Sequence, residues 1–295
     1  EFGVLTMTVT YLVFLLLPLV IGFYGFLSIL EDCGYLPRLA TLVDRLLTGV
    51  GLNGRAVITL LLGFGCVTMA TITTRLLNTS REKTIAAAIL NFVIPCSAQL
   101  AVITALLAAA GGMYVLLYCS IMFVILVVLG TVLNAVLPGR SSALLIDLPP
   151  MRLPKFDNVA QKTYIKTIGF MKEATPWFFF GAAIVSIMQV TGLLEVWQNL
   201  FAPLTTNWLL LPREAATAFV MGMVRRDFGA AGFLTMELTA PQVLVGLVTM
   251  TLFVPCVASV MVLFKERGGK EGAIIWLGTW FVAFFIGGII AQIIM

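Results

Sequence analysis

The chain has 295 residues, of which 60% are hydrophobic and only 11% are charged, and its mean hydropathy is +1.06. Soluble domains carry roughly 25% charged residues, so this composition excludes an ordinary soluble domain and indicates an integral membrane protein in contact with the lipid bilayer. The net charge of +4 is scattered without a basic stripe, which argues against nucleic acid as a partner. The chain contains no histidine, so it has no imidazole metal ligand.

Eight hydrophobic segments follow one another along the chain, and most approach the roughly 20 residues that a membrane-spanning helix needs. We therefore predict an all-α polytopic membrane protein. Glycines and prolines inside several segments predict that some of them are broken or re-entrant. The segments lie near residues 8–30, 56–75, 84–109, 113–137, 170–190, 215–235, 240–264 and 272–294.

Pairs of glycines and prolines recur at a nearly constant separation, which indicates an internal repeat. We predict a first repeat over residues 1–139, a polar link over residues 140–166 and a second repeat over residues 167–295. Basic residues in the link favour a cytoplasmic position under the positive-inside rule. Paired repeats are typical of transporters, whose substrate sites form between the repeats; parallel and inverted arrangements both remain open. The pairs, 158 to 160 positions apart, are Pro18 and Pro176, Gly34 and Gly192, Gly63 and Gly222, and Pro95 and Pro255.

The stretch "GFGCVTMATITTR" in the second segment is unusual for a membrane helix. Gly63 and Gly65 lie within one turn and weaken the helix, and the freed backbone groups are tolerated where they line a cavity or are buried in protein. Cys66 follows at once, and Thr68 and Met69 add small oxygen and sulfur donors suited to a partly dehydrated cation. The alternative is that small residues here allow helices to pack closely.

Two Pro-Cys pairs, Pro95-Cys96 and Pro255-Cys256, occupy equivalent places in the two halves. Proline removes an amide donor and kinks a helix, and interrupted spans at corresponding places point to a transport site. Thiolates favour transition metals over Mg²⁺ or Ca²⁺. We therefore predict that Cys66, Cys96 and Cys256 are metal ligands on a permeation path.

Five further polar residues are candidates for the same path. Ser97 and Gln99 follow Cys96 directly, and Ser259 follows Cys256; each can ligate an ion or hydrogen-bond a neighbouring helix. Asp227 lies in "RRDFGAAG", and charges within apolar segments are functional candidates by default, unless the segment ends there. Glu173 opens the fifth segment, where it would attract cations to a mouth or remain a solvated helix end.

Five motifs in order cover nearly the whole chain: "LEDCGYLPRLATLVDRL", "LLLGFGC…ATITTR", "IPCSAQLAVI", "RRDFGAAG" and "TLFVPCVASVMVLFKERG". Together they resemble the membrane domain of the ferrous-iron transport protein B (FeoB) family. The resemblance implies Fe²⁺ import, with Fe²⁺ as the transported substrate, across the bacterial or archaeal cytoplasmic membrane through paired Gate regions. It also carries the iron path proposed for that family over to Cys66, Cys96 and Cys256. The chain reads "GFGCVTMAT" and "PCSAQLAVI" where many members read GFGCNVPAI and SCSARLPVY, which marks a subgroup.

Members of that family also have a cytosolic GTP-binding domain ahead of the membrane part. This chain contains no GxxxxGK[ST] loop, so we expect it to bind no cofactor and any GTP to act through that domain. The opening "EFGVLTM" is interpreted as the interior of a longer protein. A small accessory protein and further copies of the chain are additional candidate partners.

Three other functions compete with iron permeation. An ion-coupled carrier of an organic solute such as a nucleoside would depend on Gln99, Asp227 and Glu173 rather than on the cysteines. A non-transporting membrane scaffold would show neither flux nor metal dependence. An enzyme is the weakest alternative, because the sequence offers no nucleophile–base pair.

Overall fold

The computed structural model describes residues 13–14, 17–139, 153–224, 226–236, 238–253 and 256–294, and within these ranges it contains helices and no strand. The all-α prediction is confirmed. Three helical stretches of the described part are long and apolar enough to cross a membrane: Ser80–Ala110, Gly112–Val136 and Ala240–Ile294. The other predicted segments contain shorter or less apolar helices.

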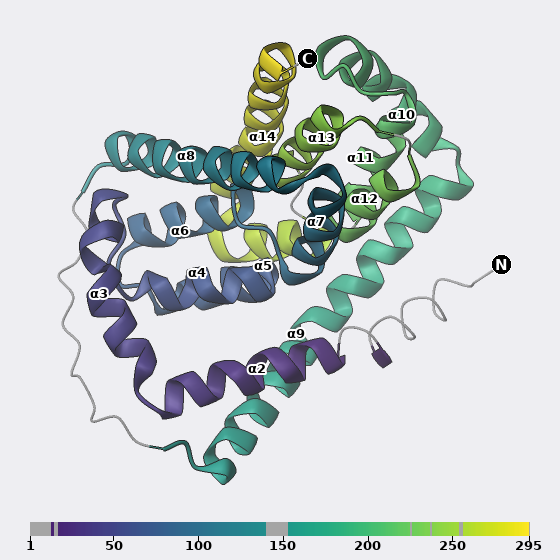
Figure 1. Cartoon of the computed structure of the whole chain (residues 1–295). Helices are drawn as coiled ribbons and strands as arrows, with labels where there is room; N and C mark the ends of the chain where they lie inside the picture. Colours follow the sequence, from purple (N-terminus) through teal and green to yellow (C-terminus); the bar gives the residue numbers. More distant parts are fainter. Residues whose placement is uncertain are drawn as a thin grey trace.

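The first half of the chain runs from α2 to α8 (Figure 1). Gly111, with φ +113°, separates α7 from α8, at the position where the sequence predicted a division. The elements are α2 (Leu17–Asp32), α3 (Tyr35–Gly49), α4 (Ala56–Gly65), α5 (Val67–Thr73), the 3-10 helix η2 (Thr74–Leu76), α6 (Ser80–Phe92), α7 (Ser97–Ala110) and α8 (Gly112–Val136).

The second half runs from α9 to α14. The long helix α9 begins inside the predicted polar link, and α14 contains a kink at Gly268, where φ is +78°. The elements are α9 (Phe156–Val190), α10 (Leu193–Pro203), the π-helical η3 (Leu204–Trp208), α11 (Glu214–Val224), α12 (Arg226–Gly232), the 3-10 helix η4 (Phe233–Thr235), α13 (Ala240–Phe253) and α14 (Val257–Ile294).

The two halves repeat the same order of elements. Gly34 precedes α3 and Gly192 precedes α10, both in the left-handed conformation that glycine adopts without strain. Each half then has a two-part helix that ends in a 3-10 turn: α4–α5–η2 in the first half and α11–α12–η4 in the second. Two helices separated by a break follow, α6 and α7 in the first half and α13 and α14 in the second. The residue boundaries of the two predicted repeats and the link remain a prediction.

Helix α13 forms the centre of the fold. Every residue from Val243 to Phe253 is buried, as expected for a helix that is apolar on all sides. Phe253 packs against α14, with its ring centroid 4.9 Å from that of Phe284 and 5.0 Å from that of Trp280. Because α13 is held in place by packing on all sides, the break that follows Phe253 is held in place as well.

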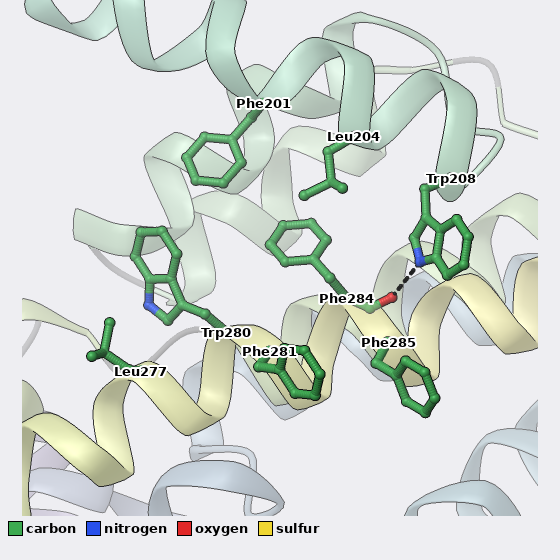
Figure 2. A pocket seen from close by; sticks show the side chains of 8 residues that line it. All are labelled: Phe201, Leu204, Trp208, Leu277, Trp280, Phe281, Phe284 and Phe285. Atoms are coloured by element: carbon green, nitrogen blue, oxygen red, sulfur yellow. Dashed lines mark hydrogen bonds between the residues drawn. The ribbon is translucent and has the colours of Figure 1, made fainter.

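The outer helices present apolar faces suited to lipid. Only 22% of the apolar stretch of α8 is buried, and Phe123 is 67% exposed. An apolar hollow of about 450 Å³ lies between α10, η3 and α14, where the Trp208 indole donates a hydrogen bond of 2.8 Å to the Phe284 carbonyl (Figure 2). Its lining contains neither acidic nor cysteine side chains. The lining residues are Phe201, Leu204, Trp208, Leu277, Trp280, Phe281, Phe284 and Phe285.

Charged residues join α2 to α9 where the two helices cross (Figure 1). Asp32, only 3% exposed, accepts hydrogen bonds from the Lys155 amide at 3.0 Å and the Lys162 ammonium at 3.4 Å. Glu31 is more exposed and pairs with Lys166 at 2.5 Å. The α2 carboxylates are therefore engaged in holding the first half against α9.

We expect Asp32→Asn to lower the free energy of unfolding by about 1–3 kcal/mol, because it weakens contacts to a buried acceptor. Glu31→Gln is the matched control, and its exposed pair contributes less than about 1 kcal/mol. Thermal unfolding followed by size-exclusion chromatography in detergent measures both. Equal losses of unfolding free energy in the two variants would contradict the larger contribution assigned to Asp32.

Helices α11 and α12 approach each other at the backbone. A Cβ atom added at Gly229 would lie 2.6 Å from the Gly222 Cα and 2.8 Å from the Ala218 carbonyl oxygen. Neither backbone atom can move without shifting its helix. The glycines therefore set the position of α12 relative to α11.

We predict that Gly229→Ala destabilises the protein by about 1–3 kcal/mol through overpacking. Gly22→Ala on α2 is the control, because no atom lies within 4 Å of a Cβ there. Alanine at this exposed helical position keeps or slightly raises the melting temperature. A Gly229→Ala variant as stable as Gly22→Ala would refute the close approach.

Candidate cation path

The first break separates α4 from α5 at Cys66. Its backbone is extended, with φ −151° and ψ +117°, between the helix that ends at Gly65 and the helix that begins at Val67. A Cβ at Gly63 would lie 2.5 Å from the Leu90 Cδ2, and one at Gly65 would clash with a phenylalanine ring of α2. Both glycines therefore allow close packing as well as marking the break.

The second break separates α6 from α7. Helix α6 ends at Phe92, Pro95 is buried in the non-helical link, and Cys96 is extended with φ −77° and ψ +165°. The Ser97 hydroxyl donates a hydrogen bond of 3.0 Å to the carbonyl oxygen of Gly65. The first two breaks are therefore in direct contact.

The third break follows α13 and brings the second half to the same place. Cys256 precedes α14, and the Ser259 hydroxyl donates a hydrogen bond of 3.0 Å to its carbonyl. The Thr68 hydroxyl lies 4.0 Å from the Cys256 sulfur, the outer limit for a hydrogen bond to sulfur. Pro255 lies outside the described residues.

The three predicted thiols are neighbours. Cys66 lies near Cys96 and Cys256, and also near the Met69 amide and the Thr68 hydroxyl. All three cysteines are partly exposed and free of disulfides. In the described part of the chain, however, no three Cys, His, Asp or Glu side chains are grouped closely enough to hold a metal ion. The breaks converge without forming a closed ligand shell.

A buried polar cluster lies next to the second break. Gln99 is fully buried, and its amide nitrogen lies 3.5 Å from the Thr251 hydroxyl, which is 2.9 Å from the Tyr118 hydroxyl. The Gln99 Oε1 has no hydrogen-bond partner. The Met69 thioether accepts a hydrogen bond of 3.2 Å from Tyr24. Sequence reasoning identified Gln99 and Met69 but not their hydroxyl partners, which lie on distant segments.

Within "RRDFGAAG" the structure describes Arg226 as a buried residue, 3% exposed. The Arg226 guanidinium donates hydrogen bonds to the carbonyl oxygens of Asn91 at 2.7 Å and Ile94 at 3.0 Å. The side chains of Asp227 and Glu173 lie outside the described part, so their predicted roles remain predictions.

Two family models match this chain. The Gate model, described as "Nucleoside recognition", matches residues 13–110 and again residues 171–270. The FeoB_C model, described as "Ferrous iron transport protein B C terminus", matches residues 115–166. The first Gate match therefore includes the first two breaks, and the second match includes the third.

Several curated relatives named "Fe(2+) transporter FeoB" match as well. The Methanocaldococcus jannaschii protein is 24% identical over 295 residues, covering 86% of this chain and 43% of the relative. The protein of Staphylococcus aureus strain COL is 24% identical over 288 residues with the same coverage. The Helicobacter pylori strain 26695 protein is 30% identical over 178 residues, covering 58% of this chain and 28% of the relative.

The chain spans less than half the length of these relatives. No solved structure matches it. The two Gate matches together cover more than half of the chain, and the FeoB_C match lies between them. The chain therefore belongs to the ferrous iron transport protein B family, of which it forms the membrane domain.

Proposed function

We propose that this chain forms the transmembrane permeation path of an Fe²⁺ importer. The observation that carries the proposal is the convergence of three helix breaks, each bearing a cysteine, from both halves of the chain. Relatives that match most of the chain are named Fe(2+) transporters. Multi-pass insertion in the cytoplasmic membrane is part of the same proposal.

The chemistry of the convergence suits a borderline divalent metal. Thiolates prefer Fe²⁺ to Mg²⁺ or Ca²⁺, and hydroxyls such as Thr68 and Ser259 can replace part of the hydration shell. Cys66 and Cys96 belong to the first half, whereas Cys256 belongs to the second. A passing Fe²⁺ ion would draw the three sulfurs together, which would link the two halves during transport.

In this proposal, the energy for transport is supplied by a part of the protein outside this chain. The relatives are more than twice as long as the matched region. We assign nucleotide hydrolysis to a cytosolic GTP-binding domain of the longer protein, while this chain supplies the path. A small accessory protein and a homo-oligomeric assembly remain candidate partners.

A nucleoside carrier is the second candidate, because the Gate model is described as "Nucleoside recognition". A nucleoside would be recognised by hydrogen-bonding groups, such as the unpartnered Gln99 oxygen and its neighbour Thr251. This function would not depend on thiols. Cysteine variants therefore separate the two proposals.

We predict that Cys66→Ser, Cys96→Ser and Cys256→Ser each weaken Fe²⁺ binding to the purified chain by about tenfold or more, on the scale that perturbing a metal site costs. Anaerobic titration in detergent gives the dissociation constants. Cys119→Ser is the control, because this cysteine is exposed on α8.

Unchanged Fe²⁺ affinity in all three variants, or no saturable binding to the unsubstituted chain, would overturn thiolate coordination. Uptake of labelled uridine into vesicles containing the chain, lost in Gln99→Ala and kept in the cysteine variants, would favour the nucleoside carrier. A chain with neither metal binding nor solute uptake would support a scaffold.

A further inference from the structure

The guanidinium of Arg226 lies at the second break, where the regular backbone hydrogen bonding of α6 ends. In a continuous helix the carbonyl of Asn91 would accept the amide of residue 95. That residue is Pro95, which has no N–H. The Arg226 guanidinium donates to this carbonyl at 2.7 Å and to the carbonyl of Ile94 at 3.0 Å.

The same positive charge lies near the thiols. The described neighbours of the Arg226 guanidinium include Cys96, Cys256, Cys66 and Tyr118. It is almost fully buried, where charge interactions are stronger than in water. A resident cation thus already binds two backbone oxygens beside the three cysteines, at the place where a passing metal ion would bind.

We infer that Arg226 is a tethered competitor of the transported cation that excludes monovalent ions from the path. The inference rests on the proposed function and assigns the selectivity of that same site. Because the guanidinium is covalently attached, its effective concentration at these carbonyls is high. Na⁺ and K⁺ carry the same single charge and gain little by displacing it.

A divalent ion has twice the charge and can also bind thiolates, so it displaces the guanidinium where a monovalent ion does not. Arginine suits this role because it stays charged when buried and presents several donors in a rigid fork. Displacement frees the Asn91 and Ile94 carbonyls for the metal. Return of the guanidinium after the metal leaves closes the break again.

Arg81 provides a matched structural comparison. It too binds backbone carbonyls at a helix end, those of Gly51 and Leu137 at 3.1 and 3.0 Å. It lies near the start of α6, whereas Arg226 lies at the opposite end of that helix. A purely structural role would make the two arginines equivalent in their effect on metal binding.

The test is anaerobic Fe²⁺ titration of the purified chain at low and high Na⁺, for the unsubstituted protein, Arg226→Gln, Arg226→Lys and Arg81→Gln. We expect Arg226→Gln to bind Fe²⁺ about tenfold more tightly at low Na⁺, a typical size for coupling between two ligands. High Na⁺ should remove this gain. Vesicles containing this variant should also admit labelled Na⁺.

Arg226→Lys retains the charge and should exclude Na⁺ while binding the two carbonyls less well; it serves as the test if the glutamine variant fails to fold. Sodium entry through a folded Arg226→Lys variant would contradict the inference. So would weaker, sodium-independent Fe²⁺ binding in Arg226→Gln, or a gain of affinity in Arg81→Gln. Absence of Fe²⁺ binding in the unsubstituted chain would instead defeat the proposed function, and the inference with it.

Discussion

Inside hydrocarbon, a backbone amide or carbonyl freed by a broken helix must find a partner within the protein, since no water is available. This constraint determines which parts of the chain must touch. The Gly65 carbonyl is bonded by Ser97 from the next break, and the Asn91 and Ile94 carbonyls by Arg226 from the opposite half. Breaks that satisfy one another in this way have to lie together.

The same constraint explains why the candidate path forms between the two halves. Arg226 of α12 closes the break after α6, and Thr68 of α5 approaches Cys256 before α14. Each half therefore completes the backbone or the thiol environment of the other. The two halves also share one apolar core, so a movement of one half relative to the other would alter this packing together with the partners of the breaks.

Sequence reasoning located the breaks because glycine and proline act locally. The division at Gly111 and the extended residues Cys66 and Cys96 lie where the pattern predicted. It could not identify the carbonyl partners of Arg226, which are 132 and 135 residues away in the sequence. Helix α9 begins at Phe156, inside the predicted link; hydropathy detects apolar helical segments and gives no signal for polar helical turns next to them.

A path that combines thiols with a buried arginine has a consequence for selectivity. Sulfur ligands alone would discriminate between metals by softness, yet they would leave the accompanying carbonyl oxygens open to abundant monovalent ions. A guanidinium bonded to those oxygens adds discrimination by charge at the oxygens themselves. Pro95 leaves the Asn91 carbonyl without its helical partner, and Arg226 binds this carbonyl and makes the break selective. One side chain therefore both satisfies the backbone at the break and selects the ion.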